Sequence, residues 1–299
     1  HPLPVVLAKG EGVHVWDVEG KKYYDFLSAY SAVNQGHCHP TIINALKTQG
    51  ETLTLTSRAF YNDVLGPYEK FMTEYFGFDK ILPMNTGAEG VETAIKICRK
   101  YAYEKRGIPE NRAKIIVCDG NFHGRTTTVI SFSNDEGARN NFGPYTPGFI
   151  NIPYNDIQAL EVALEDQDVA GFLVEPIQGE AGVVVPDTDY LREAAALCKK
   201  KDALFIADEI QTGIARTGAL LRVCGDCSCE HKCERQEPTY VKPDILILGK
   251  ALSGGAYPVS AVLADDAVMD VITPGTHGST FGGNPLGAKV AMAALDVIY

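Results

Sequence analysis

The chain alternates between two kinds of hydrophobic pattern. Short runs, rich in β-branched residues and apolar at consecutive positions, recur as KIIVCDG, FINIP, AGFLVEPI, ALFIADEI and DILILGKAL. Longer stretches with apolar residues at helical spacing separate them, such as ETAIKICRKYAYEK and TDYLREAAALCKKK. Runs that are apolar on both faces are typical of a covered, mostly parallel sheet. The alternation predicts a doubly wound α/β domain from about residue 50 onward.

A different pattern opens the chain. VHVWDVEGKKYYDF alternates apolar and polar residues around Glu19-Gly20, which predicts a β-hairpin. We therefore expect an N-terminal segment, residues 1–50, and a large domain, residues 51–299. The sequence begins at His1 and stops at Tyr299 within an uncapped helical pattern, so we expect a fragment of a longer chain.

Composition and charge narrow the range of functions. Hydrophobic residues make up 45% of the chain and charged residues 22%, as in folded globular proteins. The net charge of −11 disfavours binding to nucleic acid or to anionic membranes. No apolar run approaches the roughly 18 residues that span a bilayer. We expect a soluble protein, in the cytoplasm or the mitochondrial matrix.

The eight cysteines form two groups. The first lies among apolar neighbours, as buried free thiols do, and favours a reducing compartment: Cys38, Cys98, Cys118 and Cys198. The second crowds into CGDCSCEHKC, beside His231: Cys224, Cys227, Cys229 and Cys233. Its spacing suits a tetrahedral zinc site. A reduced surface loop is the alternative, because one cluster without a second distant CxxC is a weak zinc signature.

Polar residues follow the predicted strands. In open parallel sheets, ligands bind beyond the carboxyl ends of the strands. The polar groups found there are Asn85-Thr86-Gly87, Asp119 to Arg125, Glu175, Asp208-Glu209 and Lys250. Each alone is commonly a helix cap or a solvated side chain. Five such groups along one edge of a sheet predict a binding site.

Lys250 is the candidate nucleophile. It closes DILILG and precedes ALSGG, which predicts that its ammonium group is partly desolvated and that its pKa is lowered. An amine in this state forms a Schiff base with a carbonyl compound. The alternative is a surface lysine whose amino group extends into solvent from the strand end.

Asp208 is the candidate partner of a cation. It ends ALFIAD, a run too apolar to hold a carboxylate without a cationic or hydrogen-bonding partner. A protonated pyridine nitrogen is such a partner, and pyridoxal phosphate enzymes place an acidic residue there. A helix cap or a structural salt bridge is the alternative.

Two segments are candidates for binding a phosphate. NTGAEGVETAIKICRK places Gly87 and Ala88 directly at the start of a helix, where backbone amides suit a phosphate, although the spacing differs from the dinucleotide motif GxGxxG. HGSTFGGNP offers the hydroxyl groups of Ser279 and Thr280. The alternative for this second segment is a simple turn.

DGNFHGRT is the aromatic candidate. Phe122 and His123 suit stacking on a flat ring, and the guanidinium group of Arg125 suits a carboxylate. A core phenylalanine and a structural histidine are the alternatives for the first two.

Six segments together resemble one known family in their order and approximate spacing. They are NTGAEGVETA, FHGRT, VEPIQGEAGV, DEIQTGIARTG, GKALSGG and HGSTFGGNP, and the family is the class III ω-aminotransferases, which are fold-type I pyridoxal phosphate enzymes. Within this class, LSAYSAVNQGHCHP and LTLTSRAFYND are most similar to ornithine aminotransferases. The resemblance covers essentially all 299 residues. It implies a mostly parallel sheet with helices on both faces, a cofactor-binding large domain, and an N-terminal segment belonging to a small α+β domain.

The resemblance also implies roles for individual residues. Lys250 is the lysine that is linked to pyridoxal phosphate and shuttles the proton, and Asp208 is the partner of the pyridine nitrogen. The further cofactor contacts are Gln211 at the phenolic oxygen, Phe122 and His123 at the ring, Gly87 and Ala88 at the phosphate, and Thr280 at the phosphate of a second subunit. The substrate residues are Tyr30, Arg125, Glu175 and Glu180, the last pairing with an arginine. The implied substrates are L-ornithine and 2-oxoglutarate, and the implied assembly is an obligate homodimer with its active site at the subunit interface.

This sequence departs from the family pattern in two respects. The family has a C-terminal small domain with a carboxylate-binding arginine, and a substrate-contacting tyrosine before the position of His1; neither is among these 299 residues, and we do not expect turnover from a polypeptide limited to them. The interval from Asp208 to Lys250 is also longer than usual, and the surplus coincides with a Cys-rich insertion at residues 224–241.

Three alternative functions stay open. The first is an aminotransferase for acetylornithine or 4-aminobutyrate, and the second is a truncated, non-catalytic scaffold. A nicotinamide oxidoreductase is the third, and it is disfavoured because no GxGxxG follows an early strand.

Overall fold

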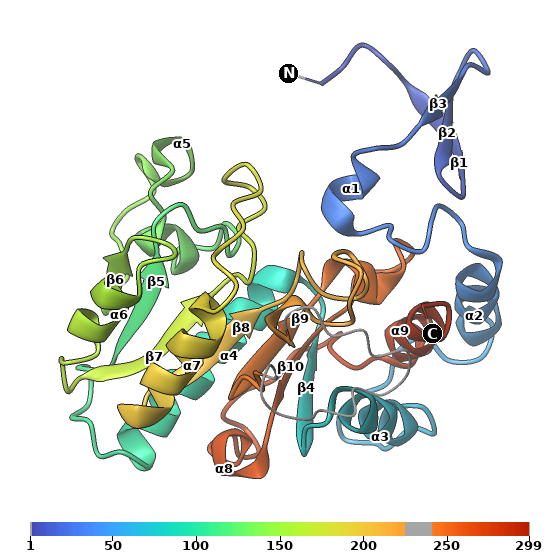
Figure 1. Cartoon of the computed structure of the whole chain (residues 1–299). Helices are drawn as coiled ribbons and strands as arrows, with labels where there is room; N and C mark the ends of the chain where they lie inside the picture. Colours follow the sequence, from blue (N-terminus) through green and yellow to red (C-terminus); the bar gives the residue numbers. More distant parts are fainter. Residues whose placement is uncertain (1, 225–240, 299) are drawn as a thin grey trace.

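A seven-stranded sheet forms the centre of the computed structural model, which describes residues 2–224 and 241–298 (Figure 1). In spatial order the strands are β4 (Lys80–Met84), β10 (Ser260–Ala264), β9 (Ile245–Leu248), β8 (Leu204–Asp208), β7 (Val169–Val174), β5 (Lys114–Cys118) and β6 (Phe149–Ile152). Within this sheet, β10 runs antiparallel to both of its neighbours, and the other pairs are parallel. The predicted α/β fold with a mostly parallel sheet is confirmed.

Helices cover both faces of the sheet, as predicted. One face carries α4 (Gly87–Glu104), α8 (Asp266–Met269) and the 3-10 turn η1 (Val129–Phe132). The other carries α3 (Leu65–Phe76), α6 (Ile157–Ala163), α7 (Tyr190–Lys200) and α9 (Pro285–Asp296). Successive strand residues enter opposite cores: Ile115 packs on the α4 side, and Ile116 packs on the α7 side. This two-sided burial explains why the strands read as continuous apolar runs.

The start of α4 is fixed by its own sequence. Thr86 is the N-cap, and its side chain and that of Glu89 form a capping box. Gly90 lets the helix lie close to β9, because a Cβ atom there would be 2.9 Å from Ile247 Cγ2. The helix N-terminus is thereby held against the edge of the sheet where the strands end.

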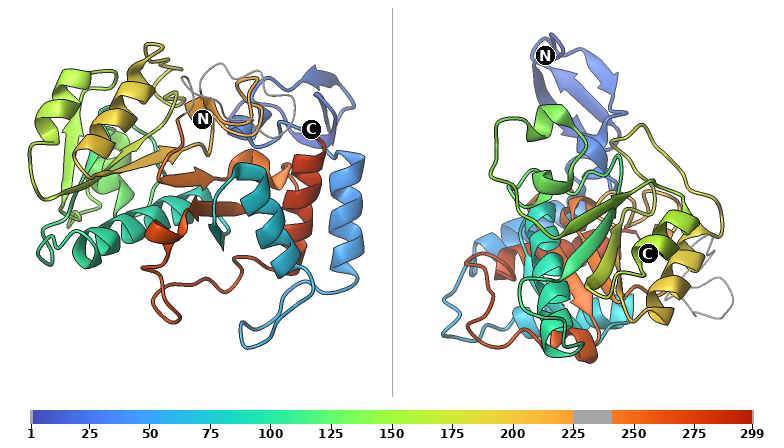
Figure 2. Two further views of the ribbon diagram at one scale, coloured as in Figure 1. Left: turned by 60° about the horizontal axis from the view of Figure 1, so that its bottom comes forward. Right: turned by 90° about the vertical axis from the view of Figure 1, so that its left-hand side faces the viewer.

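The N-terminal residues form a separate small sheet. It consists of β1 (Leu7–Glu11), β2 (His14–Asp17) and β3 (Lys22–Tyr24), all antiparallel, and it stands away from the large sheet (Figures 1 and 2). The predicted hairpin is the β2–β3 pair. A short turn, α1 (Ser28–Ser31), leads on toward α2 (Pro40–Gly50).

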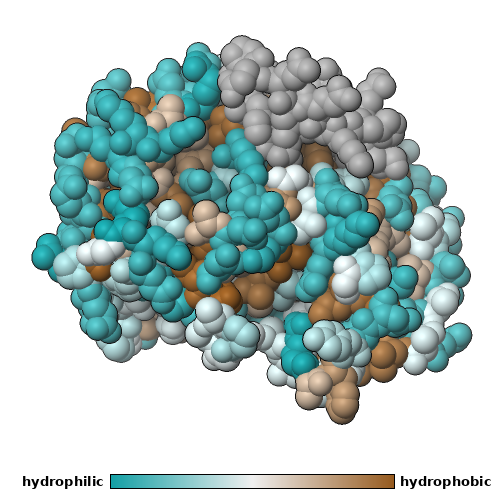
Figure 3. Space-filling view, turned by 90° about the horizontal axis from the view of Figure 1, so that it is seen from below, coloured by the Kyte–Doolittle hydropathy of each residue, from teal (hydrophilic) through white to brown (hydrophobic). Residues whose placement is uncertain are grey.

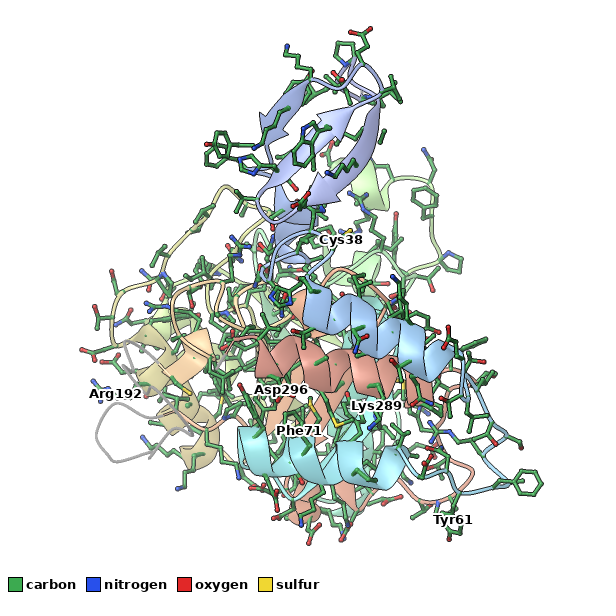
Figure 4. The ribbon with its side chains drawn as sticks, turned by 90° about the vertical axis from the view of Figure 1, so that its right-hand side faces the viewer. Cys38, Tyr61, Phe71, Arg192, Lys289 and Asp296 are labelled. Atoms are coloured by element: carbon green, nitrogen blue, oxygen red, sulfur yellow. The ribbon has the colours of Figure 1, made fainter. Side chains whose placement is uncertain are left out.

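Helix α2 packs on the large unit. Ile42 of α2 shares a buried cluster with Val290 of α9, and Figure 4 shows α9 between α2 and α3. The boundary at residue 50 stays a prediction. The remaining short elements are α5 (Glu136–Arg139), η2 (Arg222–Cys224) and η3 (Lys250–Ser253).

Hydrophilic side chains predominate on the face in Figure 3, and within the described ranges no helix has the length and hydropathy to cross a bilayer. Three of the scattered cysteines are buried: Cys98, Cys118 and Cys198. The expectation is wrong for Cys38, which is exposed because it lies in the connection before α2, outside both cores of the sheet.

The candidate zinc ligands fall mostly outside the described residues. Cys227, Cys229, His231 and Cys233 lie there, while Cys224 is described and buried. Among residues 2–224 and 241–298, His, Cys, Asp and Glu form no group of three that could hold a metal ion.

Candidate active site

A cavity of about 190 Å³ lies at the carboxyl ends of the central parallel strands. Eight of the residues singled out from the sequence line it together: Gly87, Ala88, Phe122, His123, Glu175, Asp208, Gln211 and Lys250. They come from separate segments of the chain, each following a strand or opening a helix. The structure thus brings the polar groups after the strands to one place.

Asp208 and His123 form a buried pair on the cavity wall. Asp208 is 4% exposed, and its Oδ2 is 2.7 Å from His123 Nδ1, while its Oδ1 accepts a hydrogen bond from the Ile210 N–H at 3.1 Å. Burial opposes charge on His123, but the hydrogen bond to Asp208 and the charges of Asp208 and Glu175 raise its pKa above the ordinary value. His123 Nε2 is buried and has no hydrogen-bond partner among the described residues. His123 thus orients the Asp208 carboxylate.

Lys250 enters the cavity from the end of β9. Its backbone is in the left-handed region, with φ of 43°, which is strained for a residue with a side chain. Burial lowers the pKa of its amino group, and the charges of Asp208, Glu180 and Glu175 only partly oppose this effect. The lowered pKa expected from the sequence is therefore present, and it favours the nucleophilic, neutral amine.

Glu175 supports the aromatic wall. Its Oε2 accepts a hydrogen bond from the Phe122 N–H at 2.9 Å, and burial raises its pKa to about 7. Glu209 has a different role, because it does not line the cavity. Burial also raises its pKa to about 7, and it accepts hydrogen bonds from Thr212 Oγ1 and the Val223 N–H, which tie η2 to the end of β8.

Close backbone contacts shape the end of the cavity at α4. A Cβ atom at Gly87 would be 3.0 Å from Ile210 Cδ1, and one at Gly124 would be 3.0 Å from Ala88 Cβ. Gly124 also has φ of 122°, a conformation that favours glycine. The helix N-terminus and these two glycines leave a backbone cradle of the kind that accepts a phosphate group.

Four of the predicted residues lie outside this cavity and are exposed: Tyr30, Arg125, Glu180 and Thr280. The Arg125 guanidinium carbon is 5.6 Å from the centre of the Phe122 ring, so this residue lies beside the aromatic wall. Glu180 is near enough to affect the pKa of Lys250. Thr280 lines a different groove, together with Arg58 and Ser279.

Three lining residues had no sequence signal: Ile177, Ile210 and Thr212. A fourth, Gly124, lies within the selected segment from Asp119 to Arg125. Ile177 and Ile210 each lie two residues beyond a residue that was selected, Glu175 and Asp208. Polarity at the strand ends could not identify them, because these two side chains supply apolar walls.

Comparison with known proteins places this chain in a family. The family model "Aminotransferase class-III" matches residues 1–299. The chain belongs to the class-III aminotransferases. The resemblance noted from the six motifs is therefore confirmed, and the cofactor of this family is pyridoxal phosphate.

Individual class-III relatives are similar over the whole of this chain. The mitochondrial ornithine aminotransferase of Drosophila ananassae is 61% identical over 298 residues, which is 100% of this chain and 66% of that protein. The chain thus spans slightly less than two thirds of that relative. The ornithine aminotransferase of Plasmodium falciparum is 56% identical, covering 99% of this chain and 69% of its own length.

Solved structures of similar proteins have the same fold as this chain. The ornithine aminotransferase of Toxoplasma gondii superposes with a TM-score of 0.93 at 54% identity, covering 100% of this chain and 68% of that one. A second structure of the T. gondii enzyme is described with pyridoxal phosphate at partial occupancy in its active site. The acetylornithine aminotransferase of Elizabethkingia anophelis has a TM-score of 0.84 at 61% identity, covering 100% of this chain and 68% of that chain.

The residues of the cavity fit the family's cofactor. A buried carboxylate suits a protonated ring nitrogen, an aromatic side chain suits a flat ring, and an amine of lowered pKa suits an aldehyde. The glycine-lined end of the cavity suits the phosphate. Each part of the group thus has a matching side chain or backbone segment.

Proposed function

We propose that the protein transfers the δ-amino group of L-ornithine to 2-oxoglutarate, with pyridoxal phosphate as cofactor. The products are glutamate and glutamate-5-semialdehyde, which cyclises to pyrroline-5-carboxylate. The observation that carries this proposal is the meeting of Lys250, Asp208 and Phe122 in one cavity beside a phosphate cradle. Relatives that are named ornithine aminotransferases support the choice of substrate.

Five residues would position the cofactor within this chain, in addition to Lys250, which would hold it, and His123 beside the ring. Asp208 would face the pyridine nitrogen, Phe122 the ring and Gln211 the phenolic oxygen, while the backbone at Gly87 and Ala88 would take the phosphate. When bound, pyridoxal phosphate supplies an electron sink for the carbon that carries the transferred nitrogen.

The chain's own residues move the proton. Lys250 would hold the cofactor, and its Nζ would take a proton from the δ-carbon of ornithine and return one in the following step. His123 and the Ile210 N–H hold the Asp208 carboxylate in place, so that it keeps the proton on the ring nitrogen. With 2-oxoglutarate the same residues would act in reverse order, and the reaction would be ping-pong because the first product leaves before 2-oxoglutarate binds.

The exposed residues at the cavity mouth would select the substrate. Arg125 has no carboxylate partner among the described residues, so its fork of N–H donors is open to the α-carboxylate of ornithine. Tyr30 would contact the same substrate. Glu175 would line the part of the site that ornithine enters. Glu180 would pair with an arginine while ornithine is bound.

A homodimer would complete the site. Thr280 and Arg58 line a groove of about 640 Å³, beside the exposed aromatic residues Phe60, Tyr61 and Phe281. Tyr61 lies on an outer loop (Figure 4), where a second copy would reach it. In this arrangement Thr280 would contact the phosphate bound by the partner subunit.

An amino-donor screen tests the substrate. We expect L-ornithine with 2-oxoglutarate to yield pyrroline-5-carboxylate and glutamate faster than acetylornithine or 4-aminobutyrate yields glutamate. The acetylornithine alternative rests on the 61% identity to the E. anophelis enzyme of that name, and a higher rate with acetylornithine would establish it. A protein that stays colourless when supplied with pyridoxal phosphate would instead be a non-catalytic scaffold.

A further inference from the structure

The turn that carries Tyr30 is strained. Four consecutive residues, none of them glycine, have positive φ: Ser28 (47°), Ala29 (45°), Tyr30 (58°) and Ser31 (72°). This conformation is unfavourable for residues that carry a side chain. Tyr30 is 69% exposed, so burial of its own side chain does not hold the turn. Other contacts must therefore stabilise it.

Asp25 Oδ1 accepts hydrogen bonds from the Leu27 and Ser28 N–H groups within the N-terminal segment, and two further polar side chains link the turn to the large unit. Arg216 Nε donates a hydrogen bond to Asn34 Oδ1 at 2.9 Å, and Arg216 Nη2 donates to Ser28 Oγ at 3.3 Å and also to Asn34 Oδ1. In the opposite direction, Asn34 Nδ2 donates to the Ile214 carbonyl oxygen at 2.9 Å. We call this arrangement the Arg216–Asn34 clasp. It joins segments about 180 residues apart, and it uses both ends of the Asn34 amide.

The other side of the clasp closely follows the cavity wall in the sequence. Ile214 and Ala215 also have positive φ, 56° and 65°, and they closely follow the cavity residues Gln211 and Thr212. Ile214 is 1% exposed, and its N–H donates to the Leu220 carbonyl oxygen at 2.7 Å. The clasp therefore fixes the Tyr30 turn to the buried residue Ile214, two residues beyond the cavity residue Thr212.

Arg216 is exposed, so its effect on the Tyr30 turn can be separated from its effect on the stability of the whole protein. Polar contacts of exposed side chains contribute little to the free energy of unfolding of a whole protein. A strained turn on the surface is different, because a small change in free energy changes its local population. Removing the clasp should release the turn without unfolding the sheet.

We infer that Arg216 and Asn34 are positioning residues that set the orientation of Tyr30 and thereby the selectivity for the amine donor. This inference rests on the proposed function, because it takes Tyr30 as a substrate contact. Neither residue contacts the reacting atoms. Their effect reaches the substrate through the backbone of residues 28–31.

The experiment compares Arg216→Ala with the wild-type holoenzyme. We expect KM for ornithine to rise roughly tenfold with kcat changed less than about twofold, since an orienting contact is lost and the chemistry is intact. Amide hydrogen exchange at Ala32 and Val33, whose N–H groups donate to the Ser28 carbonyl oxygen, should accelerate roughly tenfold. Arg216→Lys, which restores one charged donor, should recover part of both effects.

Two further variants complete the design. In a Tyr30→Ala background, Arg216→Ala should raise KM for ornithine no further. Arg192→Ala is the matched control, because Arg192 forms an exposed ion pair with Asp189 on α7, far from the turn (Figures 1 and 4).

The outcomes separate this inference from the proposed function. An Arg216→Ala protein with wild-type KM for ornithine, or with unchanged exchange at Ala32 and Val33, overturns the inference. A wild-type holoenzyme that does not use ornithine overturns the proposed function, and the exchange measurement then still decides whether the clasp holds the turn. A lower melting temperature in Arg216→Ala with unchanged exchange at the turn would assign Arg216 a merely structural role and also overturn the inference.

Discussion

The fold holds the cavity and the Tyr30 turn, which we propose act on one substrate, by different means. Asp208 follows Ile206 and Ala207, both 0% exposed, so the sheet core places its carboxylate. Tyr30 lies on a strained surface turn that is held by hydrogen bonds across about 180 residues. The comparison teaches that the core positions the residues proposed for the chemistry, whereas a few polar contacts hold the residue proposed for substrate selection. The two can therefore be changed separately.

The largest effect is expected at the centre of the cavity. Lys250→Ala removes the amine that holds the cofactor and moves the proton, so kcat should fall about 10²–10⁴-fold or more. The visible absorbance of the bound cofactor should be lost as well. Transamination rates and absorbance spectra of the purified protein measure both effects. The control is Lys289→Ala, because Lys289 is an exposed lysine on α9 (Figure 4). A Lys250→Ala protein as active as the Lys289→Ala protein would contradict the role of Lys250.

A smaller loss of kcat is expected when the Asp208 carboxylate, which lines the same cavity as Lys250, is neutralised. Asp208→Asn keeps the shape of the side chain but removes its charge, so the ring nitrogen loses its partner and kcat should fall roughly a hundredfold. The control is Asp244→Asn, because Asp244 lies before β9 and accepts a hydrogen bond from the Phe205 N–H at 2.7 Å, away from the cavity. That variant should lose stability and keep kcat. Equal kcat values for the two variants would rule out the role of Asp208.

The buried carboxyl of Glu175 makes stability depend on pH. Its pKa is about 7 in the folded protein and near 4.3 in an unfolded chain, so its stabilising contribution is complete below about pH 4 and is lost as the pH rises through 7. Glu175→Gln should therefore stabilise the cofactor-free protein relative to wild type by about 2–3 kcal/mol at pH 8, and much less at pH 5. Urea unfolding at both pH values measures this difference. The exposed Glu161→Gln should show no such dependence, and a pH-independent effect of Glu175→Gln would show that burial does not raise the pKa of this carboxyl.

The smallest effect is expected where the N-terminal segment meets the large unit. Gln35 Nε2 donates hydrogen bonds to the Ala251 and Ala294 carbonyl oxygens, at 2.9 and 3.1 Å. Gln35→Ala leaves both without this donor and should cost about 1–2 kcal/mol of unfolding free energy, with less than a twofold change in kcat. Gln167→Ala, an exposed glutamine with one local hydrogen bond, is the control for the melting temperature. A large loss of kcat in Gln35→Ala would show that the two regions do not act separately.

The sequence predicted the cavity better than it predicted the turn. Asp208 and Lys250 each follow an apolar strand, and parallel strands end at one edge of a sheet, so their proximity follows from the pattern. The apolar walls Ile177 and Ile210 could not be separated from ordinary core residues by polarity. The clasp was beyond prediction, because Asn34 and Arg216 lie far apart in the sequence and positive φ at four residues without glycine has no local signal.

The central claim is that Lys250 is the residue to which pyridoxal phosphate is bound. The direct test is borohydride reduction of the cofactor-supplied protein, followed by proteolysis and mass spectrometry of the peptides. The account predicts a pyridoxyl group on the peptide that contains GKALSGG, attached at Lys250 and absent from the Lys250→Ala protein. A label on another lysine, or no label on a folded protein with saturating cofactor, would contradict it.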